Sequence, residues 1–285
     1  MAKKCIVCNS DKYIKLYQNN SFLGYPAYIC NKCKLYFVFC SGKEVQERCK
    51  EFYSRVYWNK FRKKWEDKRR LLNIIIKILR SLNIHPLHQA WHYRIIKKFY
   101  PRTKSKKLLE IGCGKGETLI YFSKIGFDVR GIEPDVDNTK KINRYFKRKV
   151  CIDDLAENIK IKEKFDVIYL YRVFEHLFRP DLFLEKIKNN LNKDGIIFLD
   201  VPNCENKKVL YKSINNNPHI YNFTSKSIKK LFEKHNYKIL KICTYSEISR
   251  NYIIKFILML LRLNNYKETQ NTKGTGICIL AKNKN

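Results

Sequence analysis

The residues best suited to bind a ligand are three closely spaced glycines and an acidic residue downstream of them. The apolar run 108–111 leads into Gly112-Cys113-Gly114-Lys115-Gly116, after which a helical pattern begins. Glycines let a ligand approach the backbone closely, and N–H groups at a helix N-terminus favour anionic groups. Glu133 follows Gly112 by 21 residues, at the end of a second apolar run. A carboxylate there can accept hydrogen bonds from both ribose hydroxyls, so the pattern predicts a nucleoside cofactor.

Two pairs of cysteines near the start of the sequence have the spacing of metal ligands. Cys5 and Cys8 form one CxxC pair, and Cys30 and Cys33 form another. Four thiolates can close a tetrahedral zinc site, and a site with no open position is structural rather than catalytic. The alternatives are four unrelated thiols or a redox pair, and no thioredoxin-like unit surrounds either CxxC. Because a segment of about 40 residues has too small a core to fold alone, we expect zinc to stabilise it.

The elements that must position these residues alternate between strand and helix from about residue 106. Strands are expected at 107–111, 127–132, 149–152, 165–171, 195–201, 237–245 and 275–282, and helices at 116–125, 135–147, 180–191, 224–236 and about 248–263. The turn Asn192-Lys193-Asp194-Gly195 predicts a loop between a helix and a strand. The pattern predicts an α/β fold, with a Rossmann-like, mostly parallel sheet of seven strands and helices on both faces.

The sequence divides into three zones. Residues 1–40 are expected to form the zinc-binding head, 41–104 a basic helical segment, and 105–285 the α/β domain. The formal net charge is +33, and the middle zone is the most densely positive. This charge could meet nucleic acid, phospholipid or a phosphorylated substrate, or it could be a solvated face. Lysine far outnumbers arginine, which argues against a dedicated nucleic-acid binder.

The sequence also bears on where the protein works. No signal-peptide pattern precedes the first CxxC pair, and the eleven cysteines read as reduced thiols, so we expect a cytoplasmic protein. The apolar window 253–261 is interrupted by Lys255 and is shorter than the roughly 20 residues of a membrane-spanning helix. It could pack against the last strands or rest weakly on a membrane surface. The sequence predicts no oligomeric state.

From Leu108 onward the motifs resemble, in order and spacing, the class I S-adenosylmethionine-dependent methyltransferases. The matching segments are 108–116, Gly131 to Pro134, Phe165 to Ile168, Glu175-His176 and Asp194 to Asn203. The resemblance covers about residues 105–285. It includes a last strand, at 274–282, that is similar to the inserted antiparallel strand of these enzymes. The glycine spacing differs from that of Rossmann dehydrogenases, the rival interpretation.

The resemblance implies roles for several residues around S-adenosylmethionine. Glu110 would approach the methionine ammonium group, and Gly112, Gly114 and Gly116 would pass under the amino-acid moiety. Tyr171 would line the mouth of the pocket.

The nucleoside half of the cofactor would meet a second set of residues. Glu133 would hold the ribose hydroxyls through charge-assisted hydrogen bonds. Asp154 would meet the adenine amino group, with Asp153 as the alternative, and Leu155 would lie against the adenine ring.

The methyl acceptor would lie over the carboxyl ends of the strands, where ligands bind in open α/β sheets. His176 and His219 are the candidate catalytic bases there, because imidazole titrates near neutral pH. The alternatives are that His176 is a scaffold residue and that His219 only organises a long loop. Arg172 would be available to an anionic acceptor.

The resemblance also suggests an acceptor. Cys30 to Cys33 followed by 34–38 resembles the zinc-binding head of some bacterial sugar C-methyltransferases. This implies a small-molecule acceptor such as a nucleotide-linked sugar or a surface-polysaccharide intermediate. Two alternatives stay open: an RNA methyltransferase with a zinc head, and a non-catalytic scaffold that binds the cofactor.

Overall fold

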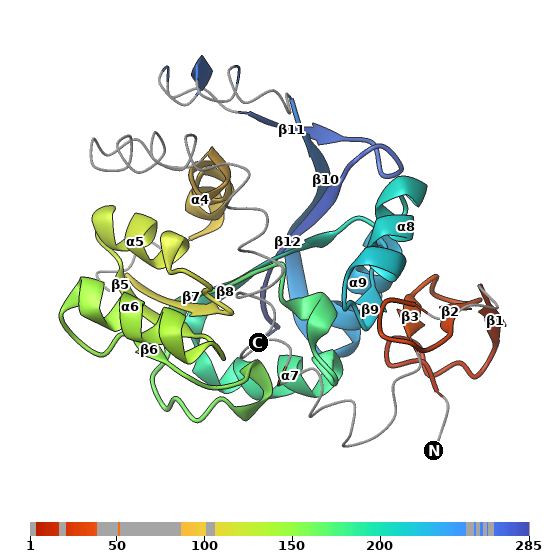
Figure 1. Cartoon of the computed structure of the whole chain (residues 1–285), viewed down its shortest axis with the longest axis horizontal. Helices are drawn as coiled ribbons and strands as arrows, with labels where there is room; N and C mark the ends of the chain where they lie inside the picture. The colour runs from red at the N-terminus through yellow and green to blue at the C-terminus, as the bar shows by residue number, and fades with distance from the viewer. Residues whose placement is uncertain are drawn as a thin grey trace.

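The computed structural model describes residues 4–16, 21–38, 51, 87–100, 106–248, 254, 257–258, 261 and 265–284. Their central feature is an eight-stranded sheet with the order β11-β10-β12-β8-β7-β4-β5-β6 (Figure 1). The strands are β4 (Lys107–Ile111), β5 (Asp128–Ile132), β6 (Cys151–Ile152), β7 (Phe165–Tyr171), β8 (Leu191–Pro202), β10 (Tyr237–Glu247), β11 (Tyr266–Thr269) and β12 (Gly276–Asn283).

The strand directions confirm the Rossmann-like fold. Strands β4, β5, β6, β7 and β8 are parallel to their neighbours within this group. Strand β12 lies between β8 and β10 and is antiparallel to both, as expected for the last strand. The eighth strand, β11, was not predicted. It is short, polar and half exposed, and it adds antiparallel to β10 at the edge of the sheet.

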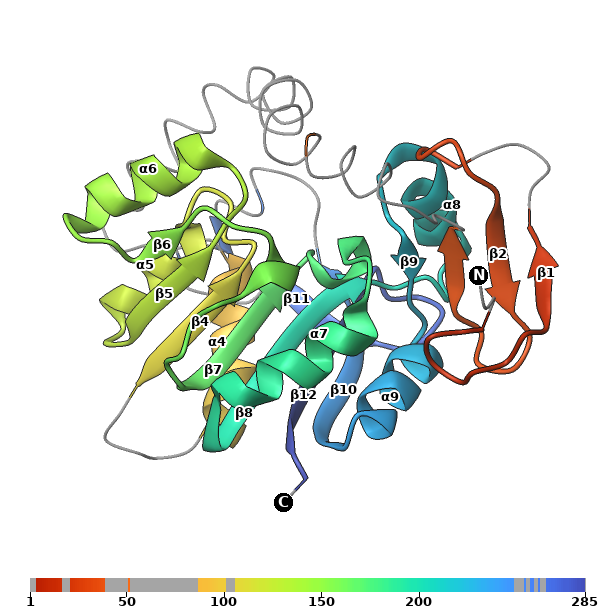
Figure 2. The same ribbon diagram turned by 90° about the horizontal axis from the view of Figure 1, so that it is seen from below.

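Helices cover both faces of this sheet, as predicted. Neighbouring residues of a strand point to opposite faces, so Leu108 joins the core under one set of helices and Leu109 the core under the other. Helices α4 (Leu87–Phe99), α5 (Glu117–Lys124) and α6 (Val136–Phe146) pack on the first face. Helices α7 (Pro180–Ile187) and α9 (Ser225–Lys234) pack on the second (Figure 2).

Capping residues set where two of these helices begin. Thr224 caps α9, and its side chain and that of Ser227 form a reciprocal capping box. Asp135 caps α6 by accepting a hydrogen bond of 2.7 Å from the backbone N–H of Asn138. Helix α8 (Lys207–Asn216), capped by Asn206, was not predicted. The short 3-10 helices are η2 (Ala156–Asn158), η3 (Phe174–His176) and η4 (Lys188–Asn190).

The predicted loop Asn192–Gly195 instead lies within β8. The pairing of β7 with β8 runs from Phe165 opposite Leu191 to Val167 opposite Ile196, so the extra residues of β8 form an irregularity in the strand. A side chain on Gly195 would come within 2.8 Å of the carbonyl oxygen of Phe165. The turn residues therefore permit a bulge rather than a break.

The N-terminal residues form a second, four-stranded sheet with the order β1-β2-β3-β9. Three strands come from the head, β1 (Tyr13–Lys15), β2 (Ala27–Cys30) and β3 (Tyr36–Val38). The fourth, β9 (Tyr221–Asn222), comes from the α/β domain and pairs with β3 (Figure 1). Val7, Leu35 and Phe37 also belong to the same core as α7 and α9. The head is thus joined to the domain by a shared sheet and a shared core.

Some predicted elements cannot be compared. Most of segment 41–104 and of the helix expected near 248–263 lies outside the described residues, apart from α4.

In the described part of the chain, no helix is both long enough and apolar enough to cross a membrane.

Candidate functional site

The glycine turn between β4 and α5 has a backbone that requires glycine. Gly112, Gly114 and Gly116 all have positive φ, at 68°, 53° and 77°. A Cβ on Gly112 would lie 2.4 Å from a methyl carbon of Val173, and one on Gly116 would lie 2.7 Å from Ile142. The turn is therefore tightly packed against the segment that follows β7, and larger residues are excluded from it.

Glu110, near the end of β4, is a buried acid with one unused oxygen. Its side chain is 3% exposed, and within the described residues its Oε2 atom has no hydrogen-bond partner. Burial raises the pKa of this carboxyl group well above its ordinary value. An ammonium group would satisfy the unused oxygen and favour the charged form, which fits the expected role of Glu110 toward the methionine end of the cofactor.

Glu133, directly after β5, connects the glycine turn to α6. Its Oε2 accepts from the N–H of Gly114 at 2.7 Å, and its Oε1 accepts from the N–H of Asp135 at 3.2 Å. Each carboxylate oxygen has two lone pairs and can accept more than one hydrogen bond. The buried carboxylate is held in place before any ligand binds.

Asp154 and Leu155 follow β6, on the next strand outward. Asp154 Oδ1 accepts from the N–H of Leu155 at 2.8 Å and from the side chain of Asn158 at 3.0 Å. This fixes the start of η2. Asp153, the alternative, is exposed. Of the two acids, Asp154 is the one whose side chain the local structure holds.

Tyr171 and Arg172 end β7 and begin the segment beside the glycine turn. Arg172 Nε lies 2.9 Å from Asp200 Oδ1, and its Nη2 donates to the hydroxyl of Tyr245 at 3.1 Å. Arg172 also has a positive φ of 58°, which a non-glycine residue seldom adopts. Its guanidinium is already paired with a fully buried carboxylate, which disfavours the expected role toward an anionic acceptor.

Sequence reasoning missed the contribution of α4 to this region. The His88 ring stacks on the Tyr171 ring with centroids 4.9 Å apart. His92 Nδ1 lies 2.6 Å from the Tyr169 hydroxyl, and its Nε2 lies 3.4 Å from Asp200. The two histidines are four residues apart and so share one helix face. That spacing was the available signal.

The two histidines proposed as bases lie together with Glu175. The His176 and His219 rings have centroids 4.6 Å apart, and His219 Nε2 is 4.0 Å from Glu175 Oε1. One ligand atom from each of the three residues lies within 4.8 Å of the others. The cluster follows β7, at the carboxyl edge of the sheet and beside Val173, which contacts the glycine turn.

Burial sets the protonation of this cluster. It lowers the pKa of His176 to about 4 and that of His219 well below its ordinary value. It raises the pKa of Glu175 to about 8. Both imidazoles are thus neutral at pH 7 and weakly basic, which disfavours either as a strong general base.

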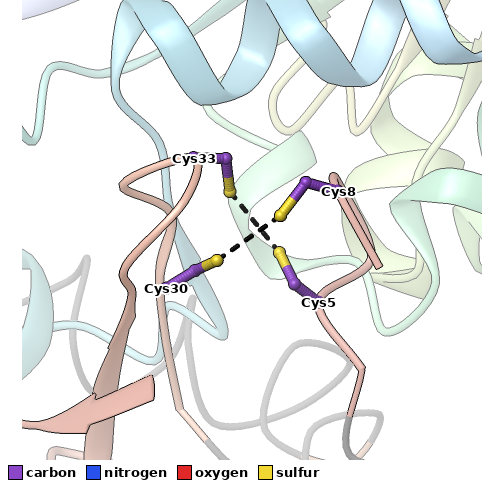
Figure 3. A group of neighbouring side chains, drawn as sticks. All are labelled: Cys5, Cys8, Cys30 and Cys33. Atoms are coloured by element: carbon purple, nitrogen blue, oxygen red, sulfur yellow. Dashed lines mark hydrogen bonds between the residues drawn. The ribbon is translucent and has the colours of Figure 1, made fainter. Parts of the chain in front are cut away.

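The four N-terminal cysteines converge on one point (Figure 3). Cys5 and Cys33 have their sulfur atoms 3.5 Å apart, as do Cys8 and Cys30, and all four lie within 4.8 Å of one another as free thiols. A tetrahedral zinc ion with Zn–S bonds of about 2.3 Å sets its sulfurs about 3.8 Å apart. The cluster therefore has the ligand type and spacing that zinc requires.

Both CxxC pairs fold the same way. The N–H of Asn9 donates to the carbonyl of Cys5 at 2.8 Å, and that of Lys34 donates to the carbonyl of Cys30 at 2.9 Å. Asn9 and Lys34 have positive φ of 57° and 62°. The two turns therefore form a matched pair of knuckles around the sulfurs.

Comparison with known proteins gives one family and several relatives. A family model described as "Methyltransferase domain" matches residues 84–242. A ubiquinone biosynthesis O-methyltransferase of Pelagibacter ubique (strain HTCC1062) is 33% identical over 126 residues, 41% of this chain and 52% of that protein. A tRNA U34 carboxymethyltransferase of Campylobacter lari is 28% identical over 131 residues, 41% of this chain and 42% of that protein. The chain thus spans about half the length of these curated relatives.

Solved structures share the fold. A SAM-dependent methyltransferase from Archaeoglobus fulgidus aligns with a TM-score of 0.52 at 19% identity, over 69% of this chain and 93% of that one. A plantazolicin methyltransferase solved in complex with SAH aligns with a TM-score of 0.50 at 18% identity, over 84% of this chain and 99% of that one. At these identities the likeness concerns the arrangement of helices and strands.

Proposed function

This chain belongs to the methyltransferase domain family, and from that premise we propose that it transfers a methyl group from S-adenosylmethionine to a small-molecule acceptor. The observation that carries the proposal is the pairing of the glycine turn with two buried carboxylates, Glu110 and Glu133. Glu110 has a buried oxygen with no hydrogen-bond partner among the described residues, which would suit an ammonium group, and the Glu133 carboxylate is held against the glycine turn by the N–H of Gly114.

The proposed roles of the other cofactor residues follow from their places in the fold. Gly112, Gly114 and Gly116 carry no side chains, so that the amino-acid moiety can lie against the backbone of the turn. Asp154 and Leu155 lie beyond Glu133, where the adenine ring would extend. Tyr171 closes the pocket beside His88.

Methyl transfer requires the acceptor atom to be aligned with the methyl group and water to be excluded from the site. When bound, S-adenosylmethionine supplies a methyl group on a positively charged sulfur. The residues of this chain bring the acceptor into line with that group, which accounts for much of the rate in such displacements. We propose that Glu175, His176 and His219 contribute to this alignment, because Glu175 and His176 closely follow Val173, which contacts the glycine turn.

The acceptor is proposed to be a small molecule with an oxygen nucleophile. In its favour is the name of the Pelagibacter relative, an O-methyltransferase of a small-molecule pathway. None of the relatives described above is named for a sugar, so the nucleotide-linked sugar expected from the zinc head gains no support from them. RNA is the second candidate, favoured by the name of the Campylobacter relative and by the net charge of +33.

Calorimetry tests the donor. We expect S-adenosylmethionine to bind, and Glu133→Ala to weaken binding at least tenfold because a charge-assisted pair of hydrogen bonds is lost. Glu157→Ala, on η2, is the matched control and should bind like wild type. Unchanged affinity in Glu133→Ala would contradict the cofactor site.

A methyl-transfer assay identifies the acceptor. The protein is incubated with labelled S-adenosylmethionine and, in parallel, with quinol and phenol extracts, nucleotide sugars and total tRNA. Label in none of these substrates would favour the scaffold alternative.

We propose that the head, residues 1–40, holds zinc through Cys5, Cys8, Cys30 and Cys33, and that it is packed on the α/β domain through β9. Their sulfur positions support this. Zinc binding requires reduced cysteines. This agrees with the cytoplasmic location predicted from the sequence, which stays a prediction. Metal analysis of protein purified without oxygen should find zinc that the Cys30→Ser variant lacks.

A further inference from the structure

We propose that Asp200, on β8, is a positioning residue for the cofactor site. It holds Arg172 in a left-handed backbone conformation and thereby fixes the turn after β7 against the glycine turn. The effect on the cofactor rests on the proposed function, whereas the hold on the turn stands on the contacts of these residues.

Arg172 has a backbone conformation that its residue type does not favour. Its φ of 58° lies in the left-handed region, where a side chain crowds the backbone. The other non-glycine residues of this kind in the described part of the chain are Asn9 and Lys34, in the knuckles, and Lys147 and Asn236, where α6 and α9 end. Tight turns and helix ends commonly take such a residue. Arg172 instead follows a strand of the central sheet, so tertiary contacts must hold its conformation.

Asp200 holds both the backbone and the side chain of Arg172. The N–H of Arg172 donates to the carbonyl of Asp200 at 3.0 Å, and Arg172 Nε lies 2.9 Å from Asp200 Oδ1. Arg172 Nη2 also donates to the hydroxyl of Tyr245 at 3.1 Å. Because its two ends are fixed to neighbouring strands, Arg172 has little freedom to change φ.

The Asp200 carboxylate is charged although it is completely buried. Burial alone would raise its pKa, but the positive charge of Arg172 and the contacts from His92 and Cys278 outweigh burial and keep the pKa below its ordinary value. Asp200 and Arg172 therefore form an ion pair at neutral pH. Removing the charge of one partner leaves the other without its counterpart.

The second oxygen of Asp200 lies beside helix α4. Asp200 Oδ2 is 3.4 Å from His92 Nε2. His88, one turn earlier on α4, stacks on the ring of Tyr171. The same carboxylate is therefore connected to two neighbours of Tyr171, which are Arg172 along the chain and α4 in space.

The conformation of Arg172 decides what packs on the glycine turn. The next residue, Val173, has a methyl group in the space that a side chain on Gly112 would occupy. Since φ and ψ of one residue set the course of the chain after it, a right-handed Arg172 would direct Val173 away from Gly112. The glycine turn would then have to be ordered when the cofactor binds, which costs affinity.

Calorimetry with S-adenosylmethionine tests the positioning role. Asp200→Asn keeps the shape of the side chain and removes its charge, and Asp194→Asn, an exposed acid of the same strand, is the control. We expect the Kd to rise about tenfold in Asp200→Asn and to keep its wild-type value in the control. Wild-type affinity in Asp200→Asn overturns the proposal.

Two double variants separate backbone conformation from a merely structural ion pair. Arg172→Gly and Arg172→Ala are each added to Asp200→Asn, so both proteins lack the pair, but glycine adopts the left-handed region readily. We expect the glycine variant to recover most of the affinity and the alanine variant to bind about fivefold more weakly than it, or worse. Equal affinity in the two overturns the proposal. If Asp200→Asn does not fold, the glycine and alanine variants are compared with Asp200 in place, and the same two outcomes decide.

Hydrogen–deuterium exchange measures the hold on the turn without any cofactor. In ligand-free Asp200→Asn we expect faster exchange than in wild type at residues 112–116 and 172–176, and unchanged exchange in β5. Unchanged exchange in the two turns overturns the proposal. If wild type fails to bind S-adenosylmethionine, the proposed function fails, whereas these exchange rates still decide whether Asp200 holds the two turns together.

Discussion

At the scale of single residues, Glu175 shows how the fold changes the chemistry of a side chain. In the sequence it is an acid beside a histidine, a pair that fits many roles. In the structure it is buried, with Oε1 4.0 Å from His219 Nε2, and burial raises its pKa to about 8. The same burial lowers the pKa of His176 and of His219, so both are poor bases.

The raised pKa predicts how stability depends on pH. An exposed Glu has a pKa of about 4.3, so between that value and about 8 the folded state holds a proton on Glu175 that the unfolded chain has released. The free energy of unfolding therefore falls as pH rises. His176, with its pKa lowered to about 4, acts in the opposite sense up to about pH 6.5. His219, lowered as well, acts in the same sense as His176.

Between about pH 6.5 and 8 neither His176 nor His219 opposes Glu175. Over this range, wild type should lose up to about 1.4 kcal/mol per pH unit relative to Glu175→Gln, and the comparison cancels the groups that both proteins share. Urea unfolding of both proteins across this window measures the difference. Parallel pH profiles would contradict the raised pKa.

At the scale of elements, the pairing of β3 with β9 links the head to the candidate site. The N–H of Val38 donates to the carbonyl of Ile220 at 2.8 Å, and the N–H of Ile220 donates to the carbonyl of Glu175. The head also holds the last turn of α9, because Lys234 Nζ donates to the carbonyl of Ile6 at 2.8 Å. The residue after His219 thus lies between the head on one side and η3 on the other.

Loss of zinc from the head should loosen this link. In Cys30→Ser we expect faster hydrogen–deuterium exchange at residues 219–223, because a head that lacks its metal has little core of its own. Exchange in β4 and β5 should be unchanged. Cys243→Ser, a cysteine of β10 outside the cluster, is the matched control.

Equal protection of residues 219–223 in both variants would show that β9 is held without the head. Faster exchange throughout the domain would instead mean that the head stabilises the whole fold.

At the scale of the whole molecule, the net charge of +33 must be separated from specific function. A protein this basic attracts any polyanion, and such binding weakens steeply with salt. If the acceptor is a small molecule, tRNA binding should be independent of sequence and fall by about tenfold or more between 50 and 200 mM salt. Filter binding with tRNA and with an unrelated RNA measures this. Binding of tRNA alone that persists at 200 mM salt would favour the RNA alternative.

The sequence by itself determined the cofactor half of the molecule. Strand 165–171 and the glycine turn are encoded in contiguous residues, whose period and spacing follow from local geometry. The same holds for the knuckles around Cys5 and Cys30, because two short motifs suffice to predict that the four thiols converge. The loop predicted at Asn192–Gly195 was wrong. There, pairing with β7 overrides the local turn signal, and these residues form part of β8.

Only the tertiary structure decided what surrounds the acceptor. It paired Arg172 with Asp200, brought His219 to Glu175, and joined β9 to the head. These contacts join residues tens to nearly two hundred positions apart, so no local pattern encodes them. They arise because the two faces of the sheet must be covered by elements from distant parts of the chain. The glycine turn could therefore be identified from its sequence, whereas the arrangement of Glu175, His176 and His219 required the packed fold.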